Sequence, residues 1–224
     1  MSSTRFAPRR LPGAEAVPQS EAGRSGGPDG NEQLTAVTGV VLIVLLAALG
    51  VTILFIGQLT WLHLFLGFVL IGPVGLKMAS TGWRFMRYYT HNPVYVRRGP
   101  PVMWLRLLAP GVVATTVAVW ATGVVLMFLG PAHRDPWVLL HKASFIAWIA
   151  VTALHVLGHL LDLPAALRAD ALRDTGRGGG QAGAAGRVIA IAGAIVAGLV
   201  LAIVLIPDFS SWTAQGALLS GGDH

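Results

Sequence analysis

The chain contains no cysteine among its 224 residues, which excludes disulfide bonds, zinc–thiolate sites, iron–sulfur clusters and thiol nucleophiles. Any metal ion must therefore be held by His, Met, Lys or oxygen ligands. Charged residues are also scarce, at 12% against about 25% in an average soluble domain. The glycine run at 178–180 is no nucleotide-binding fingerprint, because no strand pattern precedes it. The scarcity of charge, with the apolar content described next, excludes an ordinary water-soluble globule.

Apolar residues make up 54% of the chain, and the mean hydropathy is +0.66. Five apolar stretches are each long enough to cross a bilayer core of ~30 Å, and they span 34–56, 59–80, 111–130, 137–161 and 188–206. Bare backbone polar groups cannot face lipid, so each stretch is expected to be an α-helix. The sequence therefore predicts an all-α membrane protein.

The remaining segments are polar. Residues 1–33 are rich in Pro, Gly, Ser and Glu and are expected to form a disordered cytoplasmic tail. Residues 162–187 are expected to form a flexible basic cytoplasmic loop, and residues 207–224 a short outer tail. Only Gly57–Gln58 joins the first two helices, so these helices are predicted to be antiparallel neighbours, with a kink at Pro73 in the second.

The net charge of +6 and the pI of about 10.8 are explained by topology. Thirteen of the sixteen Lys and Arg residues fall in the N-terminal tail and in the loops after the second and fourth helices. By the positive-inside rule, the N-terminus is expected in the cytoplasm of a bacterial cell, with the chain in the cytoplasmic (inner) membrane. The lipid bilayer is the expected environment, and nucleic acid is not an expected partner.

Histidine within a membrane span is uncommon and suggests a function. The second predicted helix contains His63, and the fourth contains His141, His155 and His159. His141 and His155 are 14 residues apart, which places them on one helix face about 21 Å apart. His63 and His141 each lie four residues after the start of their helix, on the same side of the membrane. Matched imidazoles on two helices are the geometry of two axial haem ligands.

The pattern Leu140-His141-Lys142, Leu154-His155 and His159, with Leu62-His63 two helices earlier, resembles the small di-haem membrane cytochromes b. This group includes the membrane subunits of formate dehydrogenase and nickel–iron hydrogenase and their free-standing relatives. The resemblance covers residues 34–161 and implies a four-helix haem-binding bundle, here followed by a fifth helix. It also implies two b haems that pass electrons between quinone or quinol and a redox partner subunit. The first hypothesis is therefore an electron-transfer protein without bond-making chemistry of its own.

The sequence departs from this family because the first helix has no histidine to pair with His155. Lys77 stands 14 residues after His63, followed by Met78, and either could supply the missing ligand. His91 is a further candidate if the second helix continues and bends back. His159 is predicted to ligate an inner haem or to bond a propionate, and Arg84 to pair with a propionate. The number of haems, one or two, stays open at this point.

Two other functions remain open. In one, a haem-free transporter or channel uses the intramembrane His and Lys residues to line a pathway. No Asp or Glu within the spans and no inverted repeat accompanies them, which disfavours this interpretation. In the other, the histidines only hydrogen-bond neighbouring helices in a structural protein.

Overall fold

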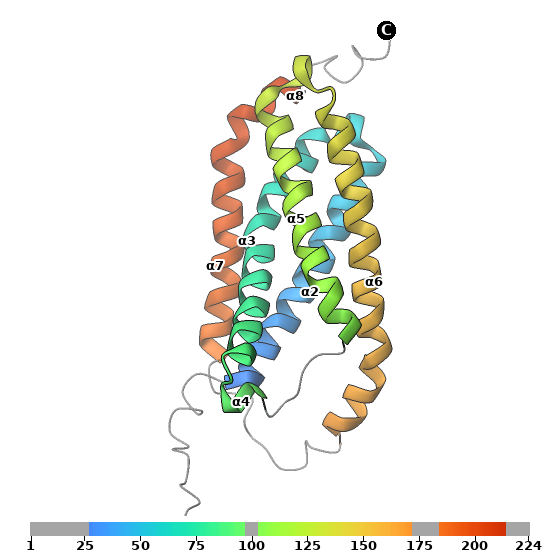
Figure 1. The fold of residues 1–224 in the computed structure, drawn as a ribbon. Coiled ribbons are helices and arrows are strands. Elements are labelled where there is room, and N and C mark those ends of the chain that lie inside the picture. Colours follow the sequence, from blue (N-terminus) through green and yellow to red (C-terminus); the bar gives the residue numbers. More distant parts are fainter. Residues whose placement is uncertain (1–26, 97–102, 172–183, 214–224) are drawn as a thin grey trace, which may run out of the picture.

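The computed structural model describes residues 27–96, 103–171 and 184–213, with side chains except at 27–29 and 159–171. Five long helices run up and down beside one another (Figure 1): α2 (Gly27–Leu54), α3 (Ile56–Tyr89), α5 (Met103–Leu129), α6 (Trp137–Ala171) and α7 (Ala184–Leu205). Four short helices are α4 (Pro93–Val96), η1 (Pro131–His133), η3 (Ile206–Phe209) and α8 (Ser210–Thr213). The end with η1 and α8 is called the upper end, and the end with α4 the lower end.

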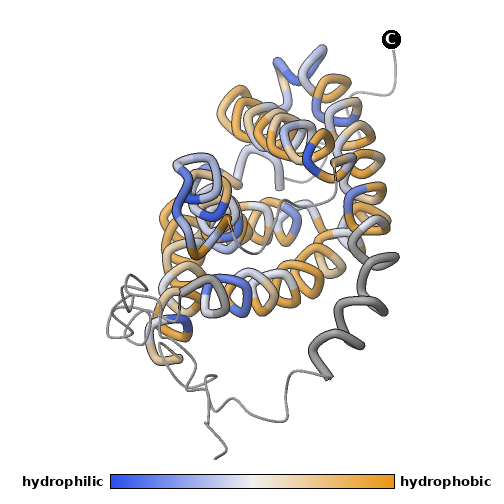
Figure 2. Tube along the Cα trace, turned by 60° about the horizontal axis from the view of Figure 1, so that its bottom comes forward, coloured by the Kyte–Doolittle hydropathy of each residue, from blue (hydrophilic) through white to orange (hydrophobic). Residues whose placement is uncertain are grey.

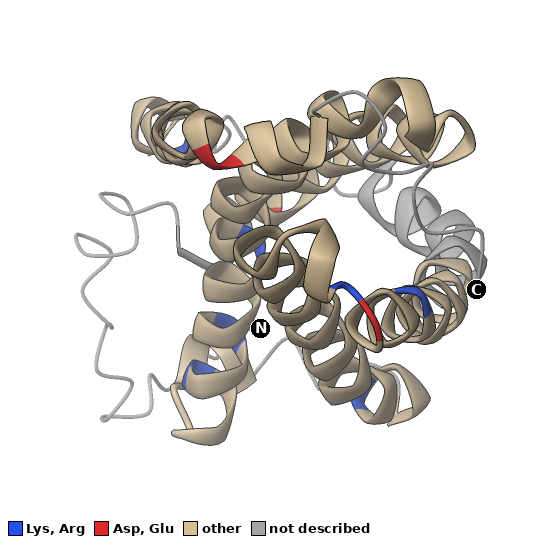
Figure 3. Cartoon of the chain, turned by 90° about the horizontal axis from the view of Figure 1, so that it is seen from above, with Lys and Arg blue, Asp and Glu red and all other residues tan. Residues whose placement is uncertain are grey.

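All five long helices are long and apolar enough to cross a membrane. Hydrophobic residues predominate along the coloured part of these helices in Figure 2, and charged residues occupy only a few short stretches of the described helices in Figure 3. The predicted all-α membrane protein is confirmed, and the chain is a multi-pass membrane protein.

Several helices are longer than predicted. Helix α2 begins at Gly27, inside the predicted tail, and α3 continues past 80 to Tyr89. The predicted basic loop is shortened at both ends, because α6 continues to Ala171 and α7 begins at Ala184. Hydropathy locates the lipid-embedded part of a helix, whereas Ala, Leu and Arg favour continued helix in water. The rest of the predicted tails and loop lies outside the described residues.

Helix α3 continues through Pro73, and the residue with non-helical backbone angles inside this helix is Leu59 (φ −110°, ψ 19°). Proline lacks an N–H, so the carbonyl of Val69 loses its helical donor. Helix α7 packs at this place: a Cβ on Gly198 would lie 2.1 Å from the Val69 oxygen, and one on Gly72 would lie 1.9 Å from the Ala194 oxygen. Two glycines thus allow each backbone to approach the other's carbonyl.

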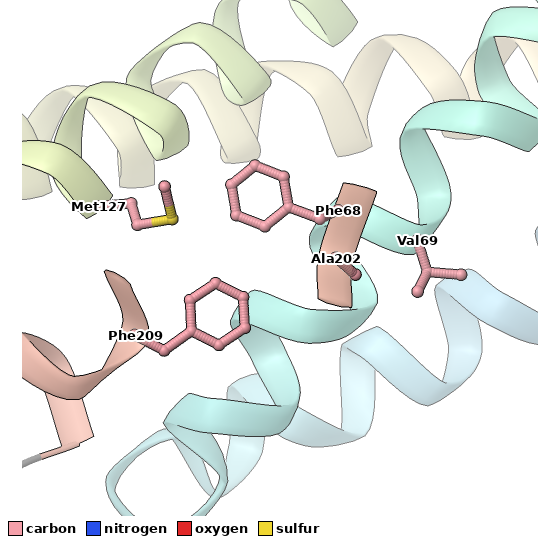
Figure 4. Packing of buried hydrophobic residues seen from close by; sticks show 5 residues of the cluster. All are labelled: Phe68, Val69, Met127, Ala202 and Phe209. Atoms are coloured by element: carbon pink, nitrogen blue, oxygen red, sulfur yellow. The ribbon is translucent and has the colours of Figure 1, made fainter. Parts of the chain in front are cut away.

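The upper end holds an apolar cluster of Phe68, Val69, Met127, Ala202 and Phe209 from α3, α5, α7 and η3 (Figure 4). Phe209 is only 1% exposed, although it follows the last predicted span. Helix α8, which follows Phe209, also packs on the upper end. Nε1 of its Trp212 donates to the carbonyls of Leu126 and Met127 at 3.2 and 3.3 Å. Part of the predicted outer tail therefore folds back and satisfies carbonyls at the end of α5.

The four helices α2, α3, α5 and α6 form two hairpins. Helix α2 packs closely along α3, and α5 packs closely along α6. Between the hairpins, α2 and α6 border an apolar cavity of about 350 Å³. Its lining includes Gly50 and Ile53 of α2 and Phe145, Trp148 and Thr152 of α6. The contact between the hairpins is therefore looser than the contact within either one.

Candidate functional site

His63 lies near the upper end of α3 and is half-buried. The short turn between α2 and α3 brings Thr52 of α2 beside it, and the Thr52 Oγ1 lies 2.9 Å from the His63 Nδ1. Thr52 is 1% exposed, and its hydroxyl donates to the Leu49 carbonyl at 2.6 Å. The first histidine of the pattern is thus fixed by the neighbouring helix of its own hairpin.

His141 is held in the same way near the upper end of α6. The Oγ1 of Thr122 on α5 lies 3.1 Å from the His141 Nδ1 and donates to the Ala118 carbonyl at 2.8 Å. Ser144 Oγ donates to the His141 carbonyl at 2.9 Å and lies 3.2 Å from the Thr122 Oγ1. A Cβ on Gly123 would come within 3.1 Å of the imidazole Cε1, so the ring packs directly on this glycine.

The two imidazoles lie at the same end of the bundle, on helices from different hairpins. Each ring contacts a threonine close to the upper turn of its own hairpin. Within the described ranges, no group of three or more His, Asp and Glu residues is arranged to hold a metal ion. Any metal bound by these two residues would have to bring its other ligands with it.

Lys77 belongs to a polar network at the lower end, between α2 and α3. Its Nζ donates to the Thr35 carbonyl at 2.6 Å, and a Cβ on Gly39 would lie 3.3 Å from it. The Thr35 hydroxyl contacts the Ser80 Oγ at 3.1 Å, and Asn31 Nδ2 donates to the Ser80 carbonyl at 3.2 Å. The ammonium of Lys77 is thus hydrogen-bonded to α2, which accounts for a lysine in this span.

The other predicted site residues are distributed along the lower half. His155 and Met78 are half-buried on α6 and α3, and Arg84 is exposed on α3. His91 follows the end of α3, where it is exposed with a φ of +58°, so α3 does not carry it back into the bundle. His159 lies in α6, but its side chain is outside the described residues. Of the predicted ligands whose side chains are described, His63 and His141 are the two that lie near the upper end.

Thr52 and Thr122 are partners of the histidines that the sequence patterns alone did not predict. The sequence does contain a feature that points to the first pair, because Thr52 and His63 are equally far from the Gly57–Gln58 turn. In an antiparallel hairpin, such residues lie at the same height. Hydropathy alone does not draw attention to threonine, which often satisfies its hydroxyl within its own helix.

Comparison of the chain with protein-family models, with curated proteins and with solved structures finds no match. The resemblance to the membrane cytochromes b therefore depends on the spacing of a few histidines. A function for the chain has to be argued from the site itself.

Proposed function

We propose that this protein is a b-type cytochrome that transfers electrons between a lipid-soluble quinone and a redox partner subunit in a bacterial cytoplasmic membrane. The observation that carries the proposal is that His63 and His141 lie near the upper end of two different hairpins, each with its Nδ1 against a threonine hydroxyl. The quinone and the redox partner are implied by the family resemblance alone.

The chemistry of the donor set fits haem b. Haem iron has four macrocycle nitrogens and takes its remaining ligands from the protein, so two imidazoles complete it. Nδ1 of each histidine is engaged by a threonine, which leaves Nε2 as the ligating atom. A small residue, Gly123, lies directly against the His141 ring.

The chain's own residues would hold and enclose the group. His63 and His141 would bind the iron from α3 and α6, and the apolar walls of the bundle would exclude water. When bound, haem b supplies one-electron chemistry, because its iron alternates between the ferric and ferrous states. The chain itself contributes ligand orientation and a low local dielectric, both of which tune the reduction potential.

Haem content and ligation would test the proposal. The protein purified in detergent is expected to show a Soret band, a dithionite-reduced spectrum typical of haem b, and at least one haem per chain by pyridine haemochrome. His63→Ala and His141→Ala are each expected to abolish binding at the upper site. His133→Ala is the matched control, because His133 is exposed in η1.

A protein that binds no haem, even after reconstitution with hemin, would overturn the proposal and favour the transporter hypothesis. Retention of all haem in His63→Ala would equally contradict it. A second haem that disappears in His155→Ala would show that the lower half also binds one, and a single haem would restrict binding to the upper pair.

A further inference from the structure

Thr52 and Thr122 occupy equivalent positions beside the two histidines. Thr52 of α2 contacts the Nδ1 of His63 at 2.9 Å, and Thr122 of α5 contacts the Nδ1 of His141 at 3.1 Å. In both cases the threonine lies on the helix that precedes the histidine's helix in its hairpin. Two hairpins without a common sequence motif thus build the same side-chain contact at the same end of the bundle.

The direction of these hydrogen bonds follows from counting hydrogens. A threonine hydroxyl carries one hydrogen, and a backbone carbonyl can only accept. Thr52 Oγ1 lies 2.6 Å from the Leu49 carbonyl, and Thr122 Oγ1 lies 2.8 Å from the Ala118 carbonyl. Each hydroxyl therefore donates to its own helix, and its oxygen can only accept from the imidazole. The Nδ1 of each histidine must then carry the hydrogen.

This assignment fixes the chemistry of the other ring nitrogen. A neutral imidazole has one N–H, so a hydrogen on Nδ1 leaves a lone pair on Nε2. Only a nitrogen with a free lone pair can ligate iron. We propose that Thr52 and Thr122 are positioning residues, which accept the Nδ1 hydrogens of His63 and His141 and so leave both Nε2 lone pairs free to ligate haem iron. The identity of the ligand rests on the proposed function, whereas the tautomer does not.

The two threonines are not equally replaceable. Thr52 is 1% exposed, so water cannot easily take its place as the acceptor for His63. Around His141, Ser144 Oγ lies 3.2 Å from the Thr122 Oγ1, so a second hydroxyl is close to the place of the one removed. The loss of the Thr52 hydroxyl is therefore expected to have the larger effect.

Substitution by valine removes the hydroxyl and keeps nearly the same shape. Thr52→Val is expected to weaken hemin binding about 10–100-fold, in line with the loss of other groups that orient metal ligands, and to shift the midpoint potential. Thr52→Ser is expected to restore both, and Thr122→Val to cause a smaller loss. Thr38→Val is the matched control: Thr38 lies on α2, is also 1% exposed, and donates to the Leu34 carbonyl at 2.7 Å.

A second measurement does not need haem. Nitrogen-15 NMR of histidine-labelled apo-protein is expected to show a protonated Nδ1 at both His63 and His141, and Thr52→Val should move His63 toward the Nε2-protonated form. The proposal is overturned if Thr52→Val and Thr38→Val have equal hemin affinities and potentials, or if wild-type His63 carries its hydrogen on Nε2. If the wild-type protein binds no haem, the proposed function fails, and the NMR result alone decides the role of the threonines.

Discussion

Helix α3 contacts α7 near its middle and contacts α2 beside His63, and these two contacts differ in kind. The α3–α7 contact is a close approach of two backbones, in which Gly72 and Gly198 leave no room for a side chain. At His63, by contrast, a threonine side chain from α2 reaches the imidazole and bonds its Nδ1. The α3–α7 contact is possible because the two glycines have no side chains, whereas the α3–α2 contact depends on one hydrogen-bonded pair of side chains.

The difference shows two ways in which membrane helices associate. Lipid is as apolar as leucine, so burial of apolar side chains gives little drive for association within the bilayer. The α7 contact therefore depends on van der Waals packing, and its strength falls when the backbones separate. The histidine contact is directional, and it can fix a proton and a ring orientation that packing alone cannot fix.

The largest effect is expected where the backbones touch. Gly198→Ala and Gly72→Ala should each destabilise the protein by about 1–3 kcal/mol, because a Cβ would overlap a carbonyl oxygen of the other helix. Thermal unfolding in detergent would measure this loss. Gly193→Ala on the same helix is the control, since its Cβ would meet no atom within 4 Å. Equal stability of Gly198→Ala and Gly193→Ala would contradict the packing of α7 on α3.

A glycine at the histidine site should affect binding more than stability. Gly123→Ala is expected to push the His141 ring, whose Cε1 would lie 3.1 Å from the new Cβ. We expect hemin affinity to fall roughly tenfold, equivalent to about 1.4 kcal/mol, with little change in unfolding temperature. Titration of the apo-protein would measure it, with Gly67→Ala as control because its Cβ would meet open space. An unchanged affinity would show that this ring position does not matter for binding.

A polar contact within the second hairpin should contribute less. Nε1 of Trp148 on α6 donates to Thr116 Oγ1 on α5 at 3.0 Å. Trp148→Phe is expected to lower stability by about 1 kcal/mol, as for other hydrogen bonds between membrane helices. Thermal unfolding would compare it with Trp120→Phe, which removes an indole with no hydrogen bond within the described part of the chain. Similar losses in both variants would mean that ring bulk, and not the hydrogen bond, stabilises the hairpin.

The smallest effect is expected at Lys77. Its Nζ donates to the Thr35 carbonyl on α2, so Lys77→Met should remove one hydrogen bond and change stability by less than about 1 kcal/mol. Haem content and the reduced spectrum should remain those of the wild type. Loss of one haem per chain in this variant would instead identify Lys77 as an iron ligand, the alternative left open by the sequence.

The sequence by itself determined the number and type of the long helices. Within lipid, an α-helix is the structure in which a single segment hydrogen-bonds its own backbone N–H and C=O groups. Five apolar stretches were therefore sufficient to predict five helices. It also predicted that His63 and His141 lie at one depth, because the rise per residue is constant along a helix. Helix ends beyond the membrane were less predictable, as α3 shows by continuing to Tyr89.

Only the tertiary structure decided which helix faces touch. Spans that are apolar all round have no polar stripe to mark the outer face, so periodicity does not reveal neighbours. The packing of α7 on α3, the return of Phe209 and Trp212 over the upper end, and the Thr52–His63 bond all appear only after the helices are placed. The position of a residue along its helix axis follows from the sequence of that helix alone. Which helix packs beside it depends on the shapes and polar atoms of both helices together.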